Sequence, residues 1–159
     1  MITQQMQVDE AAGIIASLPR VLVRSELKCD IETITAKAVA RMEHPARRIV
    51  IVAPGKLIEA TKTTFARHVL QREARQEKHI GPITFLTASQ SNCRDRYREP
   101  RYDLVVSYMV NEPRYIAAIH RLGQPHAAFW FIESLAAPPI DLSGLGMKFA
   151  TLTLHEIKV

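Results

Sequence analysis

Residues 48–53 read RIVIVA, and after the first arginine every position of this run is apolar. A strand with one face in water alternates apolar and polar residues, whereas a strand that is covered on both faces is apolar throughout. The run therefore predicts a strand in the interior of a parallel sheet, with helices packed against both of its faces.

Similar apolar runs alternate with segments whose apolar residues recur three or four positions apart. Strands that alternate with helices predict an α/β fold with a mostly parallel sheet of about five or six strands, flanked by helices. The expected strands are 20–25, 48–53, 83–88, 102–109, 127–132 and 148–159, and the expected helices are 9–18, 31–42, 56–78 and 113–122.

Single residues mark the expected ends of these helices. Asp9 and Asp30 stand where an N-cap carboxylate satisfies free backbone N–H groups, and Pro113 fits the first turn of the helix that it opens. Gly123 fits a C-terminal cap. Residues 89–101 are polar and rich in arginine, so we expect a loop there.

The composition is that of one globular domain. Of the 159 residues, 47% are hydrophobic and 23% are charged, which excludes a disordered chain. Two cysteines, Cys29 and Cys93, exclude a disulfide scaffold and a four-cysteine zinc site. We expect a single α/β domain over 1–159, with a helical extension at 1–19 and a terminal strand at 147–159.

The charge balance favours an acidic partner. Lysine and arginine number 21 against 16 acidic residues, for a net charge of +5, which suits nucleic acid or another anionic surface. Residues 1–10 are polar and lack the pattern of a secretory signal, and no apolar run approaches the length of a membrane span. We therefore expect a cytoplasmic protein with no membrane partner.

The first expected strand-to-helix loop, residues 25–33, occupies the position of a phosphate-binding loop but contains no glycine. Such a loop needs glycines to wrap a phosphate, a lysine for its oxygens, and a hydroxyl for Mg²⁺. Asp30 and Glu32 stand there instead, and each would repel a phosphate by about 1–4 kcal/mol. The plainer interpretation is that both acids stabilise the start of the helix.

The strand expected at 102–109 ends without the acidic pair that a nucleotide-hydrolysing site requires. Tyr108 and Met109 occupy those positions, and Asn111 and Glu112 follow in a turn. No HxxxH, HExxH, GxSxG or GxGxxG pattern occurs in the chain. We expect no catalytic residue, cofactor or metal, an inert Cys29, and a core position for Trp130.

Four segments together resemble the first RecA-like lobe of superfamily 1 or 2 helicases of the viral type, over residues 20–140. RVLVRS resembles the P-loop strand, and RIVIVAPGKLIEATKTTFAR resembles motif Ia, whose turn contacts the nucleic-acid backbone. YDLVVSYMVNEP resembles the Walker B strand, and AAFWFIESLAAPPI is similar to motif III. The resemblance implies a P-loop-NTPase-like three-layer sandwich and assigns a phosphate contact to Lys56. The P-loop lysine, the acidic pair and the motif III glutamine are missing, which implies a degenerate lobe without ATPase activity.

The most distinctive polar stretch is residues 94–101, RDRYREPR, just ahead of the fourth expected strand. Arginine forks grip phosphates and a tyrosine ring stacks on a base, so this stretch is a candidate nucleic-acid contact. The alternative is a solvated loop, because Asp95 and Glu99 are interspersed in it. With Lys56, the candidate contacts are Arg94, Arg96, Tyr97, Arg98 and Arg101.

Three hypotheses for function follow. The first is a non-catalytic accessory domain, in replication or in a virus or mobile element, that binds nucleic acid or a protein. The second is a structural or assembly protein that oligomerises through the terminal strand, residues 149–159, at a sheet edge. The third is an enzyme of unfamiliar type that holds Mg²⁺ with carboxylates and amides drawn from Asp30, Glu32, Asn111, Glu112 and Glu133.

Overall fold

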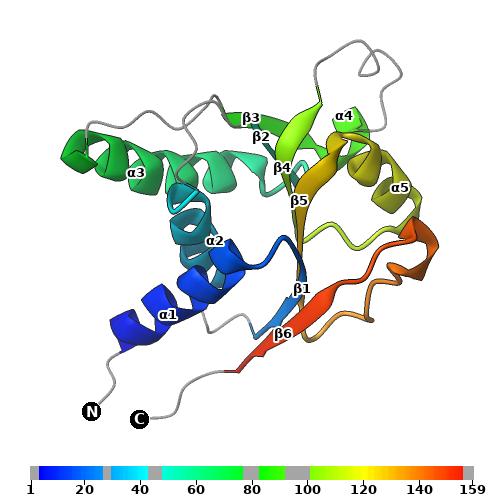
Figure 1. Cartoon of the computed structure of the whole chain (residues 1–159), viewed down its shortest axis with the longest axis horizontal. Coiled ribbons are helices and arrows are strands. Elements are labelled where there is room, and N and C mark those ends of the chain that lie inside the picture. Colours follow the sequence, from blue (N-terminus) through cyan, green and yellow to red (C-terminus); the bar gives the residue numbers. More distant parts are fainter. Residues whose placement is uncertain (1–3, 27–29, 43–47, 77–82, 92–100, 156–159) are drawn as a thin grey trace.

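The computed structural model describes residues 4–26, 30–42, 48–76, 83–91 and 101–155 (Figure 1). Its centre is one six-stranded sheet in the order β3-β2-β4-β5-β1-β6, and every pair of neighbouring strands is parallel. The strands are β1 (Arg20–Ser25), β2 (Ile49–Ala53), β3 (Ile83–Thr87), β4 (Tyr102–Tyr108), β5 (Gly123–Ser134) and β6 (Ala150–Leu154).

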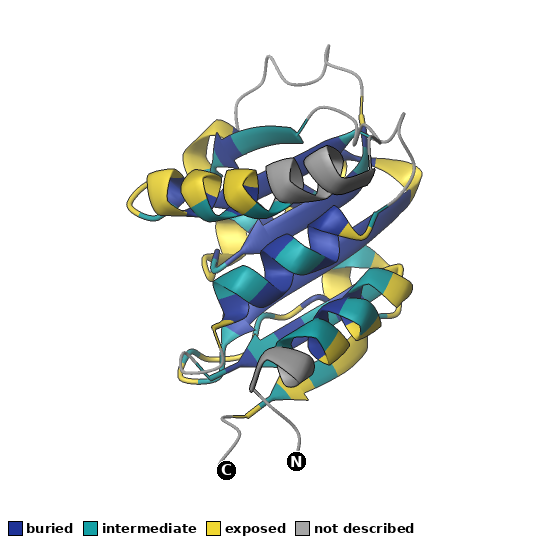
Figure 2. Cartoon of the chain, turned by 90° about the vertical axis from the view of Figure 1, so that its left-hand side faces the viewer, coloured by how far each residue is buried: buried dark blue, intermediate teal, exposed yellow. Residues whose placement is uncertain are grey.

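Helices cover both faces of the sheet, so the fold is the predicted three-layer α/β sandwich (Figure 1). In Figure 2 the buried residues follow the strands and the inner sides of the helices. One face carries α1 (Gln4–Ser17), α2 (Ile31–Ala40) and α3 (Ile58–Gln76), and the other carries α4 (Ala88–Ser91), α5 (Pro113–Arg121) and the segment 135–149 with a short 3-10 helix, η3 (Ser143–Leu145).

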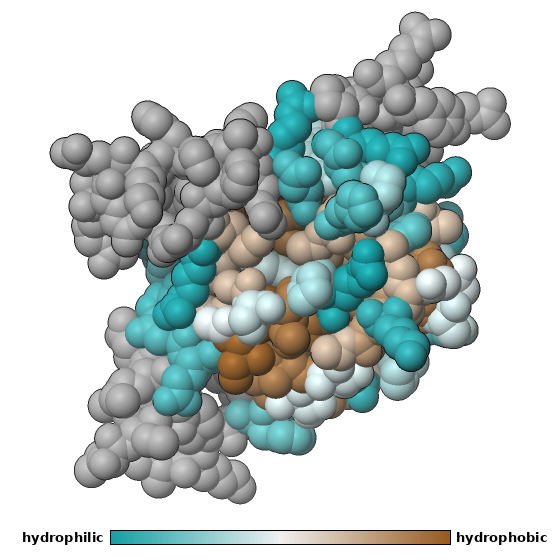
Figure 3. Space-filling view, viewed as in Figure 1, coloured by the Kyte–Doolittle hydropathy of each residue, from teal (hydrophilic) through white to brown (hydrophobic). Residues whose placement is uncertain are grey.

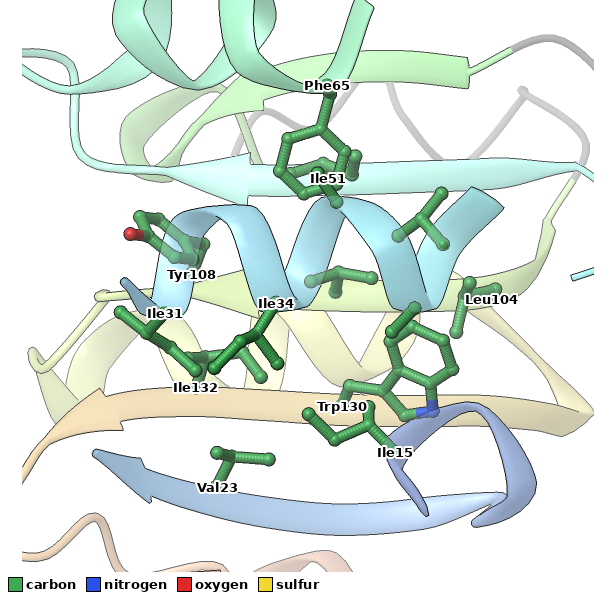
Figure 4. Packing of buried hydrophobic residues seen from close by; sticks show 14 of the residues in the cluster. Ile15, Val23, Ile31, Ile34, Ile51, Phe65, Leu104, Tyr108, Trp130 and Ile132 are labelled. Carbon is green, nitrogen blue, oxygen red and sulfur yellow. The ribbon is translucent and has the colours of Figure 1, made fainter. Parts of the chain in front are cut away.

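Each face of the sheet has its own apolar core. On the α1–α3 side, Trp130 and Phe65 are fully buried, and the Trp130 indole N–H donates to the Leu18 carbonyl at 3.0 Å (Figure 4). On the opposite side, Phe129 and Phe131 point into the second core because side chains alternate along a strand. The core position predicted for Trp130 is confirmed, and all five residues of β2 are buried as their β-branched run predicts.

One of the two predicted helix caps is wrong. Asp9 lies inside α1, and its carboxylate accepts a hydrogen bond from the Lys37 ammonium at 2.9 Å, so it joins α1 to α2. This contact between two helices replaces the predicted cap at Asp9. Asp30 stands at the N-cap position of α2 as predicted, but it has a left-handed backbone with φ of 52° and makes no side-chain cap bond.

Two further element boundaries differ from prediction: the start of β5 and the end of the strand before α4. Gly123 does not cap α5 but begins β5, which starts four residues earlier than predicted and pairs at once with Tyr102. An alanine at Gly123 would bring its Cβ within 2.4 Å of the Phe129 ring, so close packing explains the glycine. The last residue of the predicted strand 83–88 and the start of the predicted loop 89–101 form α4, which spans Ala88–Ser91, and residues 92–100 lie outside the described part.

Candidate nucleic-acid interface

The structure places the two described members of the predicted contact set far apart. Lys56 is exposed just after the carboxyl end of β2, whereas Arg101 is exposed just before the first residue of β4. Because β2 and β4 run parallel, Lys56 and Arg101 lie at opposite ends of these neighbouring strands. We call the side of the sheet where the strands begin its amino edge and the side where they end its carboxyl edge. The other predicted contacts, Arg94, Arg96, Tyr97 and Arg98, fall outside the described residues.

Arg101 belongs instead to a line of basic residues along the amino edge of the sheet, where the strands begin. Five neighbouring strands, in the order β2-β4-β5-β1-β6, each have a cation at or just ahead of their first residue. We call this set the cationic row; it consists of Arg48, Arg101, Arg121, Arg20 and Lys148.

The cationic row is not neutralised by the described part of the chain. None of its five side chains forms an ion pair there. Arg101, Arg121 and Lys148 are exposed, while Arg20 is half-buried and its Nε atom has no hydrogen-bond partner among the described residues. Asp103 is the one described acid at these strand starts, and it accepts the backbone N–H of Arg48 at 3.2 Å. The amino edge therefore carries positive charge that no ion pair in the described chain neutralises.

The sequence analysis did not single out four members of this row. A basic residue ahead of each strand was visible in the sequence, but its meaning depends on which strands are neighbours. Two strands, β4 and β5, separate β1 from β2, and that order is not readable from the chain. Sheet order is what gathers Arg20, Arg48, Arg121 and Lys148 around Arg101.

The carboxyl edge of the sheet, where the strands end, holds its charges in internal pairs. Arg24 of β1 lies beside Glu133 of β5, and its Nε donates to the Glu133 carboxylate at 2.7 Å. The same arginine donates to the Ala137 carbonyl at 3.2 Å, and the second Glu133 oxygen accepts the Ile140 N–H at 3.0 Å. Glu133 is fully buried, so this network ties β1 to the segment after β5.

Between β4 and α2 the carboxyl edge carries negative charge. Burial, and then the nearby Glu32 and Asp30 carboxylates, raise the pKa of the Tyr108 phenol. The Thr64 hydroxyl donates to Glu32, which joins α3 to α2. Met109 follows with φ of 58°, a left-handed backbone that is uncommon for a side-chain-bearing residue. A negative field at this point disfavours a nucleotide phosphate.

The five residues of the metal hypothesis do not form one cluster. The Glu133 carboxylate accepts hydrogen bonds from Arg24 and Ile140 on the face of the sheet that carries the second core. Asp30 and Glu32 lie at the start of α2, on the other face of the sheet. Glu112 is exposed and pairs with Arg114 at 2.8 Å. Among the described residues, no group of three or more histidine, cysteine, aspartate or glutamate side chains lies close enough to hold a metal ion.

No known protein-family model matches the chain, and no curated protein matches it in sequence. Within the described ranges, no helix is long and apolar enough to cross a bilayer. The site must therefore be argued from its own geometry and charge.

Proposed function

We propose that this chain is a non-catalytic domain that binds single-stranded nucleic acid along the amino edge of its sheet. The observation that carries the proposal is the cationic row, with five cations on five neighbouring strands and no ion pair among them in the described chain. Unpaired cations in a line suit a polymer of regularly spaced phosphates, because each contact releases a condensed counterion.

The length of the cationic row supports a polymeric partner. Neighbouring strands lie about 4.8 Å apart, so five strands place their cations over roughly 20 Å. That length is several times the rise along the axis from one phosphate to the next, which is about 3.4 Å for each strand of a duplex. A small anion would meet only one or two of the five side chains.

The resemblance to a helicase lobe supports the non-catalytic half of the proposal. The four segments that carry the resemblance contribute β1, β2, β4 and β5 to one parallel sheet. The edge where a nucleotide would be bound holds Asp30 and Glu32 beside Tyr108, whose pKa these acids raise together with burial. A degenerate lobe that has lost hydrolysis and binds nucleic acid at its amino edge, in place of the motif Ia turn, would act as an accessory or regulatory factor.

The proposal is tested by salt-dependent binding of a fluorescently labelled oligothymidylate with hydroxyl ends, measured by anisotropy. Each phosphate contact to a single strand contributes about 0.7 to the slope of log affinity against log salt. Five contacts predict a slope of about −3.5. A triple variant, R48Q/R101Q/R121Q, should weaken binding and reduce the slope by about 2.

The matched control removes three exposed cations from elsewhere, as K56Q/K62Q/R67Q, which gives the same net charge. If the amino edge is the interface, this control keeps most of the wild-type slope. Equal losses in both triple variants would show a diffuse electrostatic attraction and no defined interface. Absence of salt-sensitive binding by the wild-type chain would refute the nucleic-acid proposal.

A second candidate function is assembly through β6. This strand pairs with β1 and with no other described strand, so its outer edge has free backbone groups. Apolar atoms gather between the positions of α1 and β6 on the face drawn in Figure 3, where Leu152 and Leu154 are half-buried and Ile14 is 47% exposed. Sedimentation that shows a monomer at every concentration would exclude this function, and a proline at Thr153 should dissociate an assembly that uses this edge.

A further inference from the structure

A half-open hollow of about 160 Å³ lies at the amino edge, between the end of α5 and the start of β5. It is built from three segments that meet there: the residue before β4, the α5–β5 turn, and the chain just ahead of β6. The Phe129 ring forms its floor. Because Gly123 has no side chain, the α5–β5 turn can approach this ring closely. The lining side chains include Arg101, His120, Arg121, Phe129 and Met147.

His120 lines this hollow, and one of its polar atoms is buried without a partner among the described residues. The Nε2 atom of His120 makes no hydrogen bond to any described residue. The imidazole lies against Phe129, with ring centroids 5.0 Å apart and planes tilted by 33°, so packing fixes its position. A buried nitrogen without a partner costs free energy, and a ligand atom that meets it recovers that cost.

The charges around the hollow favour an anion. Arg101 and Arg121 are exposed and line it, and no acidic side chain of the described residues does. Burial is the main cause that lowers the pKa of the His120 imidazole, and the positive charge of Arg20 is the second. Arg20 therefore adds positive charge near the hollow. The carbonyl groups at the end of α5 contribute about half a negative charge, which the two lining guanidinium groups outweigh.

We propose that this hollow binds a phosphate monoester, with Arg101 and Arg121 pairing its oxygens and the His120 imidazole donating to it from Nε2. Arginine forks match phosphate oxygens in geometry as well as in charge. The hollow has room for the volume of about five water molecules, enough for a phosphate and the atoms attached to it. The inference deepens the proposed function, since a strand of nucleic acid ends in such a group when it is terminally phosphorylated; free phosphate is the other source.

Two measurements on the full chain test the inference. The first titrates inorganic phosphate and follows by NMR the backbone amide resonances of Gly123 and Gln124, which line the hollow and are present in every variant; it requires no nucleic acid. The second compares oligothymidylates of one length with a 5′-phosphate, a 3′-phosphate or hydroxyl ends. Both are repeated on H120F, which keeps a ring against Phe129, on R121Q, and on the control R67Q, whose exposed cation lies on α3.

Saturable phosphate shifts that are lost in H120F and R121Q but kept in R67Q would support the site, even if no oligonucleotide bound. A roughly tenfold gain in affinity from one terminal phosphate, lost in the same variants, would identify the strand end as its source. Phosphate shifts without that gain would identify free phosphate as the source. Linear, unsaturated shifts together with equal affinity for all three oligonucleotides would overturn the inference while leaving the proposed function standing.

Discussion

The two edges of the sheet use charge in opposite ways. At the carboxyl edge, Arg24 and Glu133 satisfy each other inside the protein, and Asp30 and Glu32 surround Tyr108 with negative charge. At the amino edge, the five cations of the cationic row have no ionic partner in the described chain. Open parallel sheets ordinarily bind ligands at the carboxyl edge. Here that edge carries the internal Arg24–Glu133 pair and the acids near Tyr108, whereas the opposite edge carries a row of cations with no ionic partner in the described chain.

The comparison implies that the carboxyl-edge pair contributes to stability and the amino-edge cations contribute to binding. The largest expected effect is therefore E133Q. The amide keeps an acceptor for the Ile140 N–H, but Arg24 loses its partner while only 22% of its side chain is exposed. Breaking a buried pair costs about 3–5 kcal/mol, and we expect about 3 kcal/mol because Arg24 keeps some solvent. Urea denaturation measures the loss.

E112Q is the matched control for this prediction. Glu112 also pairs with an arginine, Arg114, but both side chains are more than half exposed. An exposed pair of this kind contributes less than about 1 kcal/mol. If E133Q cost no more than E112Q, the carboxyl-edge pair would not be the structural tie that the geometry indicates.

The next effect concerns packing at the amino edge, where G123A is expected to lower the free energy of unfolding by about 2 kcal/mol. The new Cβ would lie 2.4 Å from the Phe129 ring, so the ring or the turn must shift. G144A is the control, because a Cβ at Gly144 meets no atom within 4 Å. Thermal unfolding of both variants checks the difference, and equal melting temperatures would contradict it.

These positions show what the sequence could and could not predict. The strand runs at 48–53 and around Trp130 predicted buried strands because a parallel sheet leaves no polar face, and both are confirmed. Asp9 was predicted as a cap and is instead bonded to Lys37, since a contact between two helices is invisible to a local pattern. Gly123 was predicted as a cap because it directly follows the expected helix 113–122. Its close approach to the Phe129 ring depends on tertiary packing, which a local pattern does not show.

The site was harder to predict than the fold for a related reason. Lys56 was predicted as a contact from its resemblance to the motif Ia turn, and Arg101 from its place in the arginine-rich stretch ahead of the fourth expected strand. Whether two strand ends meet depends on strand direction and order, and the parallel pairing of β2 with β4 sends these residues to opposite edges. The cations that do lie beside Arg101 come from segments that are distant in the chain, such as Arg20 and Lys148.

A direct comparison of the two edges uses one exposed cation from each. We expect R101Q to reduce the salt slope of oligothymidylate binding by about 0.7, the contribution of one phosphate contact. K56Q removes the same charge from the carboxyl edge and should leave the slope unchanged. Fluorescence anisotropy over a range of salt concentrations measures both. A larger loss in K56Q would reverse the assignment and return the interface to the motif Ia turn.

The smallest expected effect is a pH dependence at the amino edge. Burial, and then Arg20, lower the pKa of His120 from its usual 6.5. As the pH falls through this value, the unfolded chain takes up a proton more readily than the folded chain, so the wild-type protein loses stability. H120F cannot bind that proton, and its free energy of unfolding should therefore fall less between about pH 7.5 and pH 5.5. Urea denaturation in buffers without phosphate measures the two pH profiles, which share every other titrating group, including His68. Parallel profiles would show that His120 has the same pKa in both states, and with it that burial and Arg20 do not disfavour its protonation in the folded chain.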